Sequence, residues 1–161
     1  AEAYQCYHLA AVALELQQRE GVNVDVFYND PDTPRHLDRI AHAFGVDPLP
    51  AKRLRRGWKA RLIQLPRVLG LAKKQVLFDN KDQLLGYDMV VSPERIGGRL
   101  AMQRGSSGAA IVYVSHGPAG RAVASEHLVS HFDLILLPGE EDVRRYRAIG
   151  CLHEGGYRAT G

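Results

Sequence analysis

The stretch AAIVYVSHGPAG, residues 109–120, decides the fold of this chain. It opens with an unbroken apolar run, residues 109–114, which is typical of a buried central strand in a parallel sheet, because helices cover both faces of such a strand. In open α/β sheets, ligands bind just beyond the carboxyl ends of the strands. The turn that ends this run is therefore a candidate functional edge, and it consists of Ser115, His116, Gly117 and Pro118.

His116 is the residue of this turn that can carry proton chemistry. An imidazole titrates near neutral pH and can accept a proton from a substrate. Gly117 allows a ligand or the backbone to approach closely, and Pro118 restricts the turn. A single histidine at a strand end is explained equally well as a polar residue that ends the strand, and both interpretations stay open at this point.

Helical and strand patterns alternate along the chain. The helical patterns cover residues 1–20, 34–44, 75–85, 94–103, 122–130 and 139–149. The strand patterns cover residues 22–28, 87–91, 109–114 and 132–138. Such alternation predicts a parallel sheet. The predicted fold is α/β, a Rossmann-like open parallel sheet with helices on both faces, in a single domain over residues 1–161.

Three of these helices have predicted core faces. In the first helix the expected stripe is Tyr4, Tyr7, Ala11 and Leu14, widened by Leu9, Val12 and Leu16. The second helix is expected to begin at Thr33 as N-cap, to end at Gly45, and to bury Leu37, Ile40, Ala41 and Phe44. The last helix is expected to bury Val143, Tyr146 and Ile149.

The composition is ordinary for one globular domain: 161 residues, 45% hydrophobic and 24% charged. The sequence contains no run of ~18 apolar residues that would cross a membrane, and no signal-peptide pattern. It begins inside a helical pattern without a Met, so a processed or excised piece is expected. Cys6 and Cys151 lie far apart and form no CxxC pair, which argues against disulfides and favours the reducing cytoplasm.

Basic residues are concentrated in residues 52–74, although the net charge of the whole chain is only +3. Cations beside an amphipathic, Trp-bearing segment suit a membrane surface or a polyanion. A solvated helical face with an ordinary core side explains the pattern as well, whereas nucleic acid is not expected as a partner, because no nucleic-acid-binding motif is present. Residues 46–80 are predicted to form a basic helical insertion whose contact residues are Lys52, Arg53, Arg55, Arg56, Trp58, Lys59 and Arg61.

Motifs for several other chemistries are absent from the sequence. It has no GxGxxG after a strand, no GxxxxGK[ST] and no GxSxG, so it offers no nucleotide-cofactor fingerprint, P-loop or nucleophile elbow. His127 and His131 have a spacing that can bind zinc on a helix, but no third ligand and no HExxH pattern accompany them. Neither a cofactor nor a metal is therefore predicted.

Several pieces of the chain, taken in order, resemble the N-terminal half of a two-Rossmann-domain (GT-B type) glycosyltransferase. The closest likeness is to the CDP-glycerol glycerophosphotransferase-like family, which builds teichoic acids and related polymers. Arg158 departs from that family, in which a proline often follows the Gly-Tyr pair. The matching pieces are the opening helix from His8, VVSPER (90–95), VSHGP (114–118), FDLILLPGEED (132–142) and IGCLHEGGYRATG (149–161).

This resemblance implies that His116 is the base that deprotonates an acceptor hydroxyl. The implied partners are a nucleotide-activated donor and a polymer or lipid-linked acceptor of cell-envelope polysaccharide synthesis. Most donor contacts would come from a second domain that this chain lacks, so the chain alone is expected to be inactive. The implied location is the cytoplasm, peripheral at the inner face of the membrane. The implied substrate contacts are Ser115, Gly117, Pro118, His8, Gln5 and Ser92.

Two other interpretations remain. The chain is alternatively a non-enzymatic Rossmann-like module that uses its basic segment to dock on anionic lipid or polymer. It is otherwise one half of a UDP-sugar 2-epimerase, since such enzymes share the same broad pattern.

Overall fold

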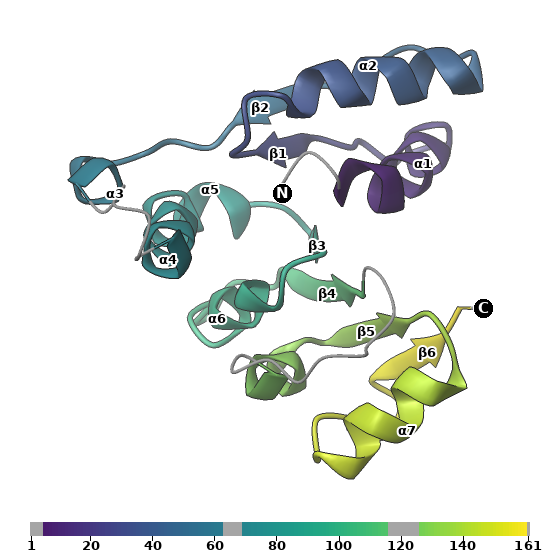
Figure 1. Cartoon of the computed structure of the whole chain (residues 1–161), viewed down its shortest axis with the longest axis vertical. Coiled ribbons are helices and arrows are strands. Elements are labelled where there is room, and N and C mark those ends of the chain that lie inside the picture. Colours follow the sequence, from purple (N-terminus) through teal and green to yellow (C-terminus); the bar gives the residue numbers. More distant parts are fainter. Residues whose placement is uncertain (1–4, 63–68, 116–125, 161) are drawn as a thin grey trace. The chain divides into compact units, whose positions relative to one another are not determined.

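Parallel strands form both sheets of the protein, and helices connect them (Figure 1). The structure is a computed structural model that describes residues 5–62, 69–115 and 126–160. The chain divides into two compact units, unit 1 (Ala1–Leu54) and unit 2 (Arg55–Gly161). The predicted α/β class with a Rossmann-like open parallel sheet is confirmed.

Unit 1 has two helices and a two-stranded sheet. Its elements are α1 (Cys6–Gln17), β1 (Val26–Tyr28), α2 (Thr33–Phe44) and β2 (Ala51–Arg53). The strands pair in parallel with Phe27 opposite Lys52, and the Leu54 N–H continues the ladder to the Tyr28 carbonyl at 2.8 Å. Residues 46–80 were predicted to form a basic helical insertion, but residues 51–53 within that range form the strand β2.

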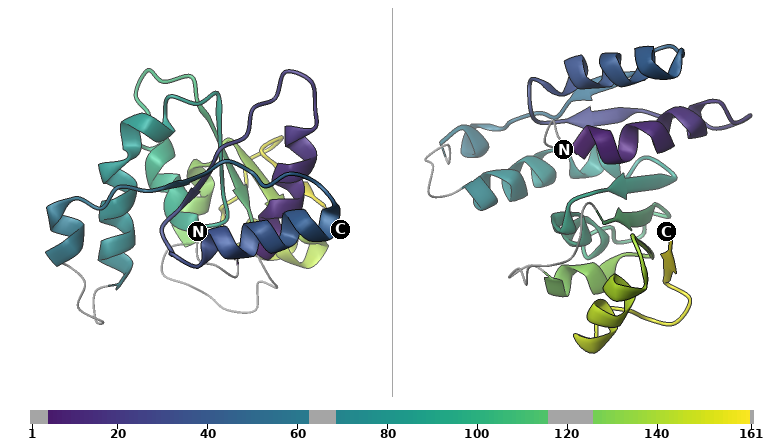
Figure 2. Two further views of the ribbon diagram at one scale, coloured as in Figure 1. Left: turned by 90° about the horizontal axis from the view of Figure 1, so that it is seen from above. Right: turned by 45° about the vertical axis from the view of Figure 1, so that its right-hand side comes forward.

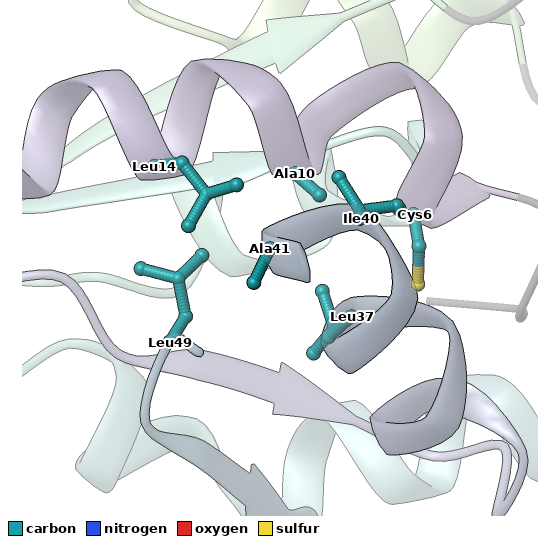
Figure 3. Packing of buried hydrophobic residues seen from close by; sticks show 7 residues of the cluster. All are labelled: Cys6, Ala10, Leu14, Leu37, Ile40, Ala41 and Leu49. Atoms are coloured by element: carbon teal, nitrogen blue, oxygen red, sulfur yellow. The ribbon is translucent and has the colours of Figure 1, made fainter. Parts of the chain in front are cut away.

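The core of unit 1 lies between α1 and α2, with Val24 and Val26 packed against it. Figure 3 shows its seven buried residues, which α1, α2 and the loop before β2 supply: Cys6, Ala10, Leu14, Leu37, Ile40, Ala41 and Leu49. On α1 the buried residues are four apart, and on α2 Ile40 and Ala41 lie three and four residues after Leu37. These are the spacings of a single helix face. Gly45 ends α2 with a φ of 65°, a left-handed conformation that glycine adopts readily.

Three expectations for unit 1 are wrong in detail. Leu14 is buried on α1 as predicted, but its buried companions are Cys6 and Ala10. Tyr7 is exposed, and its hydroxyl forms a hydrogen bond with His36 Nδ1 at 2.7 Å. Asp32, not Thr33, is the N-cap of α2, and Thr33 is buried as the first helical residue. Phe44 is exposed, because it lies in the last turn of α2, beyond the residues that pack in the core.

Unit 2 is built on a four-stranded parallel sheet (Figure 2). Its strands are β3 (Met89–Ser92), β4 (Ala110–Val114), β5 (Leu134–Leu137) and β6 (Tyr157–Ala159), and they lie side by side in chain order. The central strand β4 buries three consecutive residues, Ile111, Val112 and Tyr113. The apolar run that opens the quoted stretch is thus a buried strand, as predicted.

Helical segments connect these strands over one face of the sheet. The connections are η3 (Arg95–Gly97) with α6 (Gly98–Ala101), then η4 (Glu126–His131), then α7 (Glu140–Ala148). Right-handed crossovers between parallel strands in chain order place successive connections on the same face. The contacts agree: η3 and α6 pack on β4, α7 packs on β5, and both η3 and α6 contact η4.

Close approach between these connections depends on two glycines. A Cβ on Gly98 would lie 2.1 Å from the Leu128 carbonyl oxygen, and one on Gly97 would lie 2.8 Å from Ser92 Oγ. Phe132 also packs here: its ring lies near Gly97 and contacts the ring of Tyr113, with the centroids 5.2 Å apart. The sequence GG at 97–98, which weakens an ordinary helix, therefore permits tight packing on η4 and β3.

In the described part of the chain between β2 and β3 lie the helices α3 (Trp58–Leu62), α4 (Leu69–Asp79) and α5 (Lys81–Leu84). Asn80, between α4 and α5, joins this region through its side chain. Its Oδ1 accepts the Arg55 N–H at 2.9 Å, and its Nδ2 donates to the carbonyls of Arg55 and Val76. Asn80 is buried, and its amide thereby satisfies backbone groups of two segments.

Three details of unit 2 also differ from expectation. The helix predicted over residues 94–103 is shorter and forms as η3 and α6, and the helix predicted over 122–130 is a 3₁₀ turn from Glu126 within the described residues. Ile149 is exposed, because α7 ends at Ala148 and Ile149 is already its C-cap. Val143 and Tyr146 are buried on α7 as predicted.

Candidate functional site

Hydrogen bonds of the Ser92 side chain stabilise the turn that follows β3. Ser92 Oγ donates to the Glu94 carbonyl at 2.9 Å and accepts the Glu94 N–H at 3.2 Å. The Glu94 carboxylate in turn pairs with Lys73 Nζ of α4 at 3.1 Å. Such a hydroxyl-stabilised turn sets the direction of the next residue, Arg95. The carboxyl end of β3 therefore presents a guanidinium from a fixed backbone.

Arg95 reaches from β3 over β4 to α7. Its Nε donates to the Tyr146 hydroxyl at 3.3 Å, and its guanidinium also interacts with the hydroxyl of Tyr113. Arg95 is half-buried. Among the described residues no carboxylate pairs with it, because Glu94 is engaged by Lys73. The two partners of this cation are both tyrosine hydroxyls.

Tyr113 is the centre of this group of side chains. Burial, with a smaller contribution from Tyr146, raises the pKa of Tyr113 to about 12. The phenol is therefore neutral at physiological pH and cannot serve as a base there. Its hydroxyl also hydrogen-bonds to Ser115, the first residue after β4. We call Arg95, Tyr113, Ser115 and Tyr146 the Arg95 cluster.

The Arg95 cluster lies at the edge where a parallel sheet binds ligands. Arg95 follows the end of β3 and Ser115 follows the end of β4, and these strands are neighbours. The cluster provides hydrogen-bond donors and one positive charge. Neither Arg95 nor Tyr113 accepts a proton at neutral pH, since the guanidinium is always protonated and the Tyr113 pKa is high.

The predicted site residues are distributed unevenly over the structure. Ser92 and Ser115 lie at the carboxyl ends of β3 and β4, as expected from the strand pattern. His116, Gly117 and Pro118 lie outside the described residues, so the predicted base remains a prediction. The other two expected contacts belong to α1 in unit 1: Gln5 is 1% exposed just before the helix, and His8 is exposed on it.

The predicted basic contact residues also differ in their surroundings. Lys52 Nζ pairs with Asp25 at 2.6 Å, whereas Arg53 and Arg55 are exposed and Arg56 is half-buried. Trp58 is 68% exposed at the start of α3, and Lys59 Nζ lies 5.6 Å from the centroid of its ring. The side chain of Arg61 lies outside the described part of the structure.

Over residues 5–62, 69–115 and 126–160, no three His, Cys, Asp or Glu side chains come together to hold a metal ion. His127 and His131 lie on a 3₁₀ turn, where residues three apart rather than four apart share a face. No helix in the described part of the chain has both the length and the apolar character needed to cross a membrane.

Sequence reasoning did not single out Arg95, Tyr113 or Tyr146. A signal for Arg95 was present, because a charged residue directly follows the strand end and turn in VVSPER. Tyr113, inside an apolar strand, and Tyr146, on the inner face of a helix, carry no comparable signal, since buried aromatic residues are ordinary core residues. Neither a protein-family model nor a curated protein sequence matches this chain.

Proposed function

We propose that this chain is the acceptor-binding part of a glycosyltransferase or glycerophosphotransferase that uses a nucleotide-activated donor. The observation that carries the proposal is the polar Arg95 cluster at the carboxyl ends of β3 and β4. In open parallel sheets this edge is where ligands bind. The resemblance to GT-B enzymes, which covers the strand ends VVSPER and VSHGP, supports the same interpretation.

In the proposed reaction, His116 is the general base. Its neutral imidazole takes the proton of an acceptor hydroxyl, and the acceptor oxygen forms a bond to the transferred group of the donor. The bond from that group to the nucleotide phosphate breaks, and the nucleotide leaves with the electron pair. An imidazole suits this role because its ordinary pKa lies close to physiological pH. Ser115 and Ser92 are proposed substrate contacts beside it.

The natural full-length protein tests this proposal. It is incubated with labelled CDP-glycerol or UDP-sugars, with and without a polyol-phosphate polymer as acceptor, and transfer of the label to polymer is measured. We expect His116→Ala to abolish transfer and His131→Ala, a change at an exposed histidine, to leave it intact. Full transfer by His116→Ala would overturn the role of His116. Epimer formed from a UDP-sugar without acceptor would favour the epimerase alternative.

A second candidate function is docking on an anionic lipid or polymer surface. The observation that favours it is the exposed Trp58 with Lys59 beside its ring. An indole with an adjacent cation is suited to a membrane interface. Peripheral association with the inner face of the membrane would bring the enzyme to a lipid-linked acceptor.

Liposome sedimentation tests the docking function. We expect the chain to bind vesicles that contain phosphatidylglycerol and not vesicles of phosphatidylcholine alone. Binding should fall for Trp58→Ala and for combined neutralisation of Lys52, Arg53, Arg55 and Arg56, whereas exposed Arg39→Gln on α2 removes one charge elsewhere as the control. Binding that is insensitive to all these changes would contradict the docking function.

A further inference from the structure

From the Arg95 cluster we infer a phosphate-recognition site, in which Arg95 binds a phosphoryl group of the substrate and Tyr146 orients its guanidinium. This inference deepens the proposed function and rests on it, because it assigns the substrate class to a particular side chain. It names a residue that neither the strand pattern nor the resemblance singled out.

The positive charge of Arg95 has no carboxylate partner among the described residues. Arg95 is half-buried, and its partners among the described residues are the hydroxyls of Tyr146 and Tyr113. Glu94 pairs with Lys73, and Asp142, one turn before Tyr146 on α7, forms no ion pair with Arg95. A partly buried cation is stabilised by an anionic partner, and none is present among these residues. An anionic ligand would supply it.

The guanidinium of Arg95 has more hydrogen-bond donors than its two tyrosine partners use. A guanidinium carries five N–H donors in a planar fork. Nε is engaged by the Tyr146 hydroxyl and a second hydroxyl partner is Tyr113, so donors remain for a ligand. The fork matches two oxygens of a phosphate in a bidentate arrangement. Arg95 can therefore keep its contact to Tyr146 while it binds a phosphoryl group.

The position of the Arg95 cluster in the sheet also favours a phosphate ligand. Arg95 follows β3 and Ser115 follows β4, so the charge and a hydroxyl lie at the carboxyl edge of two adjacent parallel strands. Phosphate-bearing ligands occupy this edge in open α/β sheets. Tyr146 is fully buried on α7, and its hydroxyl accepts the Nε–H of Arg95 at 3.3 Å. The guanidinium is thus oriented before any ligand arrives.

The phosphoryl group could belong to the activated donor or to a phosphodiester in the acceptor. Both offer the same recognition chemistry, and two probes separate them: inorganic pyrophosphate represents the donor and dimethyl phosphate represents the acceptor. Sodium acetate at matched ionic strength tests whether any carboxylate binds equally well. The full chain labelled with ¹⁵N-arginine reports each titration through the Arg95 Nε–H signal, and calorimetry gives the affinity.

We expect saturable binding of pyrophosphate or dimethyl phosphate and a shift of the Arg95 Nε–H signal. Arg95→Gln should weaken binding by about tenfold or more, the typical loss for a charged hydrogen-bonding pair. Arg95→Lys keeps the charge but lacks the fork, so it should restore only part of the affinity. Exposed Arg144→Gln on α7 is the matched control and should bind like the unchanged chain.

Tyr146→Phe tests whether Tyr146 orients the Arg95 guanidinium, independently of any effect on folding. It removes the acceptor of Nε without changing the packed ring, so the melting temperature should stay close to that of the unchanged chain. Phosphate affinity should fall severalfold and the Nε–H signal should move before any ligand is added. This variant also keeps the inference testable if Arg95→Gln does not fold.

Three results would overturn the inference: no saturable phosphate binding by the unchanged chain, equal binding by Arg95→Gln, or equal binding of acetate. Failure of the proposed transferase function can be distinguished from failure of the phosphate site. Phosphate binding through Arg95 without transfer from any donor would contradict the transferase alone. Transfer that His116→Ala abolishes and Arg95→Gln leaves unchanged would contradict the phosphate site alone.

Discussion

Arg104 Nη1 donates to Asp133 Oδ2 across 2.5 Å, and the same oxygen accepts the backbone N–H of Ile111 at 2.7 Å. Asp133 also donates its own N–H to the Ile111 carbonyl at 2.9 Å. Arg104 reaches the Ala109 carbonyl as well, at 3.2 Å. These bonds join the beginning of β4 to the beginning of β5. The amino edge of the sheet is therefore held by a compensated ion pair, in contrast to the Arg95 cluster at the carboxyl edge.

This relationship predicts a pH-dependent contribution of Asp133 to stability. Burial alone would raise the pKa of Asp133, but the hydrogen bonds from Arg104 and from the Ile111 N–H outweigh it and lower the pKa. A carboxyl with a lowered pKa stabilises the fold above its unfolded pKa of about 3.9, and this contribution is lost as pH falls through the folded value. Asp133→Asn should cost about 1 kcal/mol at neutral pH, because the pair is partly exposed.

The measurement is urea unfolding of Asp133→Asn and the unchanged chain between neutral and acidic pH. The difference in unfolding free energy should shrink as the pH falls below about 4. Asp82→Asn is the control, because Asp82 is almost fully exposed and should change little at any pH. A difference that persists at low pH would show that Asp133 does not act through its charge.

Gly98→Ala should destabilise unit 2 strongly. The added methyl would lie 2.1 Å from the backbone carbonyl oxygen of Leu128, which cannot rotate away as a side chain could. We expect a loss of about 3 kcal/mol, at the upper end of the typical cost of overpacking. Gly108→Ala is the control, since its methyl would meet nothing within 4 Å. Thermal unfolding by circular dichroism compares the two, and equal melting temperatures would contradict the close approach of α6 and η4.

Leu14→Ala and Leu16→Ala test which stripe of α1 forms the core of unit 1. Leu14 is 4% exposed and packs with α2, whereas Leu16 is 36% exposed. Leu14→Ala should cost about 2–4 kcal/mol through lost burial and a cavity. Leu16→Ala should cost less than about 1 kcal/mol. Denaturant unfolding measures the loss of unfolding free energy in each variant. Equal losses would mean that the core faces a different side of α1.

The two cysteines should react slowly with thiol reagents in the folded chain. Burial raises the pKa of the Cys6 thiol and of the Cys151 thiol, so little thiolate is present at neutral pH and access is restricted. Addition of Ellman's reagent should release almost no chromophore from the native chain. In guanidinium chloride both thiols should react rapidly, and fast reaction of either one in the native chain would contradict its burial.

Local patterns were sufficient to predict the strands and most of the helices. The apolar run before Ser115 indicates a buried strand, and the glycines after α2 and α7 end those helices with φ values of 65° and 69°. These features act within a few residues, so the sequence displays them directly. On α1, Leu14 was predicted correctly as a core residue, but Tyr7 was predicted in place of Cys6. Both residue types are compatible with a core, and the packing of the neighbouring elements decides between them.

The candidate site was predicted only at its strand ends. Ser92 and Ser115 could be placed because each lies where an apolar strand ends. His116 remains a prediction because it lies outside the described residues. Arg95 and Tyr146 are 51 residues apart in the chain. No periodicity or turn signal relates residues at such a separation.

The sequence by itself determined the alternation of helices and parallel strands and the places where strands end, because apolar periodicity and turn-forming residues act locally. Only the tertiary structure decided that Arg95 meets Tyr113 and Tyr146. That meeting depends on the order of β3, β4 and β5 and on α7 packing over the same face. Long-range contacts of this kind arise from how the elements pack, which no short stretch of the chain encodes.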